Sequence, residues 1–98
     1  MDWGEGLVAL RHYQQAHPNV PIHLAYFGNI DPAVYGIRAM PLMPGERASG
    51  TVVISATYLS GQTLPDPSAY HWALQYPMTS ILNHSLYVFD VPDQGTQP

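Results

Sequence analysis

The chain contains no cysteine and no lysine, and only 10% of its residues are charged. An average soluble domain has about 25% charged residues. Without cysteine there is no disulfide, no thiolate zinc site and no cysteine nucleophile. Three scattered arginines (Arg11, Arg38 and Arg47) against seven acids give a formal charge of -4, which leaves no basic face for nucleic acid. The low charge predicts either a face covered by a partner, a membrane or the rest of a longer protein, or a surface rich in neutral polar side chains.

Long hydrophobic runs are also absent. No stretch approaches the roughly 18 apolar residues of a membrane span, and no signal peptide precedes the first expected helix. A length of 98 residues suits one small domain, so we expect a single domain over residues 2–91 and a disordered polar tail over residues 92–98. Met1 leads directly into a helix-capping sequence, which is unusual for a natural amino terminus. We therefore expect the native reading frame to begin upstream of Met1.

Hydrophobic periodicity and turn residues predict helices that alternate with three strands. A capping-box spacing at residues 2–5 predicts a helix to about Ala16, whose stripe contains Trp3, Leu7, Leu10 and Gln14. Strands are expected at residues 20–27, 50–58 and 85–91. Asp31-Pro32 and Asp66-Pro67 each predict a capped helix start, with helical residues at 33–35 and 66–76. This order predicts a small three-layer α/β domain with a mostly parallel three-stranded sheet and flanking helices.

The connector at residues 37–50 holds apolar side chains between prolines. Pro41, Pro44 and Gly45 argue against a regular element there. Met40, Leu42 and Met43 either fold back onto the core or form a face that a partner or membrane covers. We favour the core.

The patterns that carry metal, cofactor or nucleophilic chemistry are missing. His12 and His17 are five residues apart and share no helix face, so no metal site is expected. Gly-x-Gly occurs only at residues 4–6, with no strand before it, which excludes a dinucleotide fingerprint. No Gly-x-Ser-x-Gly elbow is present, and we interpret Asp31 as a cap rather than a base. We therefore expect no cofactor and no catalytic residue.

Polar and aromatic side chains follow the first two expected strands. If those strands are parallel neighbours, their carboxyl ends meet at one edge of the sheet, where open α/β folds bind ligands. Aromatic faces combined with planar polar groups suit a carbohydrate; the alternative is that the tyrosines pack the rim of a small core. The candidate ligand-binding residues are Tyr26, Asn29, Asp31, Tyr35, Ser55, Thr57 and Tyr58.

An ordered set of short motifs points to a known family. The set comprises Asp2-Trp3-Gly4, Ala25-Tyr26-Phe27-Gly28, Asp31-Pro32, Tyr35-Gly36, Ile54-Ser55-Ala56-Thr57, Leu59, Gly61, Tyr70, Trp72, Ser85 and Tyr87. In this order the chain resembles the carboxy-terminal soluble domain of bacterial multi-spanning glycosyltransferases of the dolichyl-phosphate-mannose protein mannosyltransferase-like superfamily. The resemblance covers residues 2–91. It departs from the family pattern at Glu5, at Asn29-Ile30 within the candidate site, and at Asn83-His84.

The resemblance implies that the parent protein lies in the bacterial cell membrane. It would transfer a sugar from a polyprenyl-phosphate donor to an acceptor outside the cytoplasm. The catalytic acids of that superfamily belong to the membrane-embedded amino-terminal half, so none is carried over to this chain. The implied role is an extracytoplasmic (periplasmic) accessory domain, inactive on its own. Its implied partners are the membrane-embedded part of the same polypeptide and a polyprenyl-phosphate sugar or glycan acceptor.

Two other functions stay open at this point. One is a free-standing small α/β interaction module without enzymatic activity. The other is a small hydrolase that uses Asp31 or Ser55 with a histidine. The absence of a base at a spacing typical of catalytic pairs argues against it.

Overall fold

The computed structural model describes residues 5–26, 34, 36–44, 46–60, 66 and 68–92. Its centre is a five-stranded sheet with the order β2-β1-β3-β5-β4. The strands are β1 (Ile22–Ala25), β2 (Met40–Pro41), β3 (Gly50–Ser55), β4 (Met78–Leu82) and β5 (Leu86–Val91). β1 is parallel to β2 and to β3, whereas β5 lies antiparallel between β3 and β4.

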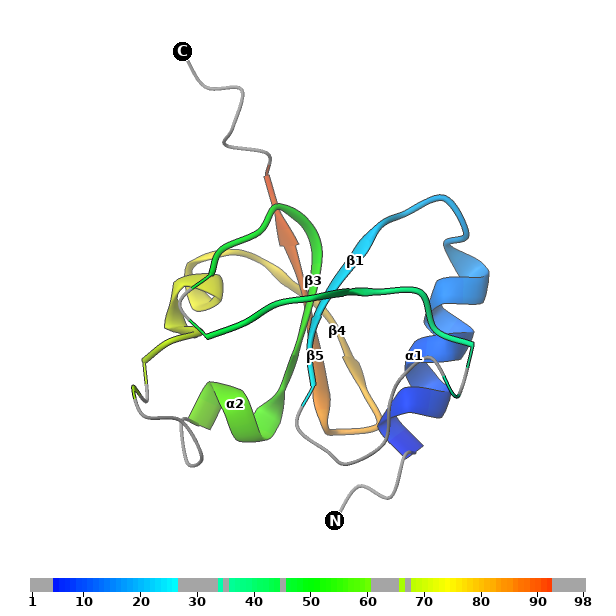
Figure 1. The fold of residues 1–98 in the computed structure, drawn as a ribbon, viewed down its shortest axis with the longest axis horizontal. Coiled ribbons are helices and arrows are strands. Elements are labelled where there is room, and N and C mark those ends of the chain that lie inside the picture. The colour runs from blue at the N-terminus through cyan, green and yellow to red at the C-terminus, as the bar shows by residue number, and fades with distance from the viewer. Residues whose placement is uncertain are drawn as a thin grey trace.

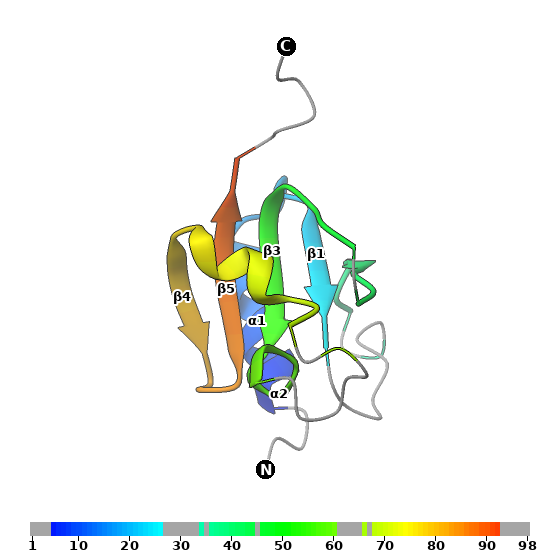
Figure 2. The same cartoon turned by 90° about the vertical axis from the view of Figure 1, so that its left-hand side faces the viewer.

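Helices lie on both faces of this sheet. The helix α1 (Glu5–Ala16) covers one face, and the short helix α2 (Ala56–Ser60) and the 3₁₀ helix η2 (His71–Gln75) lie on the other side (Figure 1). Figure 2 shows η2 in front of the strands and α1 behind them. Within the described residues, no helix has the length and apolar character that a membrane crossing requires.

The predicted mostly parallel three-stranded sheet with flanking helices is wrong. The sheet has five strands and is mixed, and α1 is the only long helix among the described residues. The prediction missed β4, which follows Pro77 directly and buries none of its five side chains fully. A tight turn joins β4 to β5, with Asn83 and His84 at φ 50° and 57°, and positive φ values of this kind are typical of two-residue hairpin turns. β4 runs in the same direction as β3. Because the hairpin then reverses the chain, β5 runs antiparallel to both strands.

Several expected boundaries also move. The first helix ends at Ala16, as predicted. The strand expected at 50–58 ends at Ser55 and turns directly into α2, and the helix expected at 66–76 is a 3₁₀ helix of five residues. The predicted helical turn at 33–35 and the polar tail at 92–98 fall outside the described residues, apart from Val34 and Pro92.

The core has two clusters, one on each face of the sheet. Alternation along β3 places Val53 in the cluster under α1, and Val52 and Ile54 in the cluster on the opposite face. The α1 cluster contains Leu7, Leu10, Ile22, Leu24, Ile37, Val53, Leu86 and Val88. The second cluster contains Ala25, Leu42, Val52, Ile54, Leu59, Tyr70, Ala73, Phe89 and Val91.

A buried tyrosine fastens the connector at residues 37–50 to the second cluster. Tyr70 is fully buried, and its hydroxyl donates a hydrogen bond of 2.7 Å to the backbone carbonyl of Leu42. Leu42 is buried as expected, but Met40 and Met43 are 45% and 58% exposed. Of the three apolar side chains expected in the core, only that of Leu42 packs there.

Burial also gives Tyr70 an unusual titration. Desolvation, followed by the nearby Tyr58 and Glu46, raises the pKa of Tyr70 to about 12. Because the pKa of Tyr70 is higher in the folded state than in the unfolded state, the neutral hydroxyl stabilises the fold. This contribution is fully present below pH 10, the ordinary pKa of tyrosine. This stability is lost as the pH rises through 12.

We expect Tyr70→Phe to cost about 1–2 kcal/mol at pH 8, because the Leu42 carbonyl loses its donor. In urea unfolding between pH 8 and pH 11.5, the variant should lose less stability than the wild type, and parallel pH profiles would contradict the assignment.

Candidate functional site

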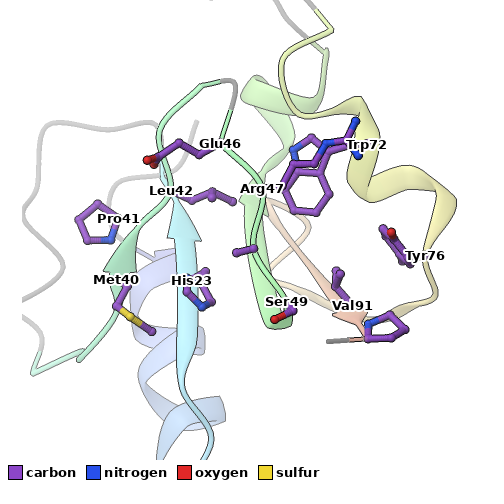
Figure 3. Close-up of a pocket in the computed structure, with 12 residues that line it drawn as sticks. His23, Met40, Pro41, Leu42, Glu46, Arg47, Ser49, Trp72, Tyr76 and Val91 are labelled. Atoms are coloured by element: carbon purple, nitrogen blue, oxygen red, sulfur yellow. The ribbon is translucent and has the colours of Figure 1, made fainter. Parts of the chain in front are cut away.

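An open groove of about 570 Å³ lies on the face of the sheet opposite α1 (Figure 3). It is found at the end where β3 begins and β5 ends, since Ser49 and Val91 both line it. One side is formed by β2 and residues 46–49, and the other by Trp72 and Tyr76. The remaining lining residues are His23, Leu42 and Pro92.

Strand alternation explains why a histidine reaches the groove. Ile22 and Leu24 of β1 pack into the cluster under α1, so His23 and Ala25 point to the opposite face. Ala25 is small and completes the second cluster, whereas the larger His23 is half-buried in the groove. Residues 46–49 line the groove together with His23 and lead into β3 through Gly50. The φ of Gly50 is +86°, a conformation that favours glycine.

Residues 46 and 47 place opposite charges on different sides of their segment. The Glu46 carboxylate accepts a hydrogen bond of 2.8 Å from the backbone N–H of Met43, so it is used in a local turn. Arg47 is exposed and makes no hydrogen bond or ion pair within the described residues. Figure 3 shows the two side chains projecting in opposite directions, with Arg47 on the side of Trp72.

The helix η2 holds the aromatic wall. A ring nitrogen of His71 (Nε2) lies 3.1 Å from the backbone carbonyl oxygen of Leu59, which ties η2 to α2. The Trp72 ring lines the groove, and its Nε1 is a buried donor that has no hydrogen-bond partner in the part of the chain described above. A buried donor of this kind calls for a specific partner such as an ordered water or a ligand group.

A second hollow of about 610 Å³ continues the groove. It shares His23, Met40, Ser49, Val91 and Pro92 with the first, and it adds the exposed Asp90. The combined surface therefore carries two carboxylates, that of Glu46 in the groove and that of Asp90 in the adjoining hollow. It also carries the Arg47 guanidinium, which has no partner within the described residues.

The structure does not bring the described candidate residues onto one surface. Tyr26 packs against the cluster under α1, whereas Tyr58 packs against the opposite cluster, with its ring 5.4 Å from that of Tyr70. Ser55 is buried at the end of β3. Thr57 lies in α2, where its carbonyl accepts the Ser60 hydroxyl at 2.8 Å. None of these four lines the groove.

Three further candidates, Asn29, Asp31 and Tyr35, lie outside the described residues. The capping role expected of Asp31 and its ligand contacts stay predictions, as does the binding role of Tyr26, Ser55, Thr57 and Tyr58.

The groove residues were missed because sequence reasoning looked at the other end of the strands. Two signals were available. Arg47 is one of only two cations in the connector at residues 37–50, the other being Arg38, and Trp72 flanks the stripe of its helix rather than lying within it. Neither signal says that the two residues line the same hollow, because 25 positions separate them.

Asp66 behaves as a local cap. Its carboxylate accepts hydrogen bonds from the backbone N–H of Ser68 at 3.0 Å and from the Ser68 hydroxyl at 2.7 Å. These bonds lower the pKa of Asp66. The helix itself begins later, at His71, so Asp66 closes the preceding turn. Among the residues that the structure describes, no cluster of three histidines or acids is arranged to hold a metal ion.

No protein-family model matches the chain, and no curated protein or solved structure shows significant similarity to it. The resemblance to the glycosyltransferase domain therefore rests on the sequence motifs alone.

Proposed function

We propose that this chain is a carbohydrate-binding accessory domain of an integral-membrane glycosyltransferase that uses a polyprenyl-phosphate-sugar donor. In this proposal the domain is non-catalytic, lies on the extracytoplasmic side, and holds the glycan acceptor in the groove. The observation that carries the binding role is the wall formed by Trp72 and Tyr76, in the same groove as the polar groups of His23, Ser49 and Arg47.

This wall suits a sugar for a physical reason. A pyranose presents apolar C–H groups on its faces and hydroxyls around its rim, so it needs an aromatic plane and several polar partners together. Trp72 and Tyr76 supply aromatic surface, while imidazole, hydroxyl and guanidinium groups supply donors and acceptors. The volume of about 570 Å³ lies within the usual range of small-molecule sites, about 300–1,000 Å³.

The remainder of the proposal rests on the motif order described above. It assigns the transfer chemistry to a membrane-embedded half of the parent protein and leaves this domain with a contact to acceptor or donor. The groove supports the acceptor, because an open surface admits one segment of a longer glycan.

The test is a calorimetric titration of the 98-residue chain with neutral tetrasaccharides that differ in linkage. We expect binding in the micromolar to millimolar range for at least one of them. Trp72→Ala should weaken it by about thirtyfold or more, because truncating a central aromatic side chain at a binding surface costs about 2 kcal/mol or more. Trp72→Phe keeps an aromatic plane and should retain most of the affinity.

The matched control is Leu74→Ala, which shortens a side chain that is 56% exposed on the same 3₁₀ helix and does not line the groove. Its affinity should equal that of the wild type. Equal affinity in Trp72→Ala, or no binding at millimolar sugar, would contradict the proposed function.

A second candidate, the small interaction module without enzymatic activity, is favoured by the sheet edge at β4. Met78 and Ile81 are about half exposed there, and β4 contains no charged residue. Edge strands without charges are open to pairing with another strand. The titration separates the two candidates, since a module of this kind binds no sugar.

A further inference from the structure

We propose that the glycan held in the groove carries a carboxylate, as in a uronic acid residue, and that Arg47 pairs with it. This inference rests on the proposed function and adds the chemical class of the ligand. The juxtaposition that carries it is the Arg47 guanidinium beside an aromatic wall, with no partner within the described part of the chain. The Glu46 carboxylate, which also lines the groove, accepts the Met43 N–H in a local turn.

Arg47, the cation in the groove, has no partner of its own among the residues that the structure describes. Most surface arginines can find a carboxylate within the chain, and this chain has more than twice as many acids as cations. Arg47 nevertheless forms no ion pair or hydrogen bond within the described residues. Its neighbour Glu46 accepts the Met43 N–H instead, so the guanidinium stays available to a ligand on the Trp72 side.

The distribution of the other charges orients such a ligand. Asp90 is the acid in the adjoining hollow, on the far side of the residues that the two hollows share. It disfavours an anion there and leaves the Arg47 end as the favourable position. Arg11 lies on α1, which covers the opposite face of the sheet, so it does not contribute.

A carboxylate fits this environment better than a phosphate monoester. A guanidinium binds a carboxylate through two parallel N–H···O bonds, and one arginine is enough to neutralise one charge. A phosphate monoester carries close to two charges at pH 7. The groove holds a single arginine, no lysine exists in the chain, and the net charge is -4, so the second phosphate charge would meet repulsion without a partner.

The experiment compares tetragalacturonate with its fully methyl-esterified form, which keeps the sugar skeleton and removes the charge. Galactose 6-phosphate and galacturonate monomers form a second comparison, of phosphate against carboxylate. Each is titrated at low and at 0.15 M salt into the wild type, Arg47→Gln and Arg11→Gln. Arg11→Gln is the matched control, because it removes the same charge from an exposed position on the far face.

We expect the acid to bind about tenfold more tightly than the ester. This preference should vanish in Arg47→Gln, persist in Arg11→Gln, and shrink as salt is raised. Because Arg47 is exposed and makes no hydrogen bond or ion pair with any described residue, Arg47→Gln should melt at the temperature of the wild type, which excludes misfolding as the cause.

The other outcomes overturn the inference in distinguishable ways. Equal affinity for acid and ester, with both lost in Trp72→Ala, would reject the carboxylate and leave the proposed function standing. Tighter binding of the phosphate through Arg47 would reject the choice of carboxylate. If neither tetragalacturonate nor its ester binds while one of the neutral tetrasaccharides does, the inference fails and the proposed function stands. If no tetrasaccharide binds, both fail.

Discussion

Replacing Phe89 by alanine is expected to lower the free energy of unfolding by about 3–5 kcal/mol, the range for deleting a buried phenylalanine. Phe89 is only 2% exposed, lies opposite Val52 in the ladder between β3 and β5, and packs in the second cluster. Because small domains are stable by only about 5–15 kcal/mol, the variant should unfold at a much lower urea concentration.

The control for Phe89→Ala is Ile81→Ala, which also deletes an apolar side chain from the sheet. Ile81 lies on the edge strand β4 and is half exposed, so its loss should cost about 1 kcal/mol or less. If the two variants lose equal stability, β5 is not the buried strand described here.

Gln14→Ala is expected to cost about 2–4 kcal/mol. Gln14 is 7% exposed on α1, and its side-chain amide bonds both backbone groups of Arg38: the Arg38 N–H donates to Oε1 at 2.9 Å, and Nε2 donates to the Arg38 carbonyl. Truncation leaves two partly buried backbone groups without partners, and each such group costs about 1–3 kcal/mol.

Gln15→Ala is the matched control, since it makes the same substitution one position along the same helix at an exposed site. Alanine is the better helix former, so Gln15→Ala should leave urea unfolding unchanged or slightly improved. A Gln14→Ala variant as stable as Gln15→Ala would show that the bridge to Arg38 does not anchor the connector.

The parts of the fold that could be predicted are those encoded by local patterns. The stripe of Leu7, Leu10 and Gln14 predicted α1, and all three side chains are buried. The apolar runs predicted β1 and β3 as strands, and the parallel pairing that the candidate site presupposed is present in their register.

The parts that could not be predicted depend on contacts between distant residues. β2 has two residues, and its one strand partner among the described residues is β1. β4 is defined by its hairpin with β5, whose turn at Asn83 and His84 has neither glycine nor proline to mark it. Without β4 there was no hairpin to reverse the chain before β5. The prediction of a mostly parallel sheet was therefore wrong.

The position of the groove shows the same limit. The rule that ligands bind at the carboxyl ends of strands belongs to open parallel sheets, and this sheet is mixed. Here α2 begins at Ala56, directly after β3, and the Tyr58 ring stacks on Tyr70. The hollow forms at the opposite end, where a hydrogen bond between residues 28 positions apart, Tyr70 and Leu42, holds the connector over the second cluster.

The central claim is that a carbohydrate binds in the groove that Arg47 and Trp72 line. The most direct measurement is a ¹H–¹⁵N correlation spectrum of the 98-residue chain recorded during titration with the tetrasaccharide that binds best. We predict the largest shifts at the Trp72 indole N–H and at the backbone amides of residues 47–49 and Tyr76. Shifts confined to Tyr26 and residues 55–58, at the other end of the strands, would contradict this account.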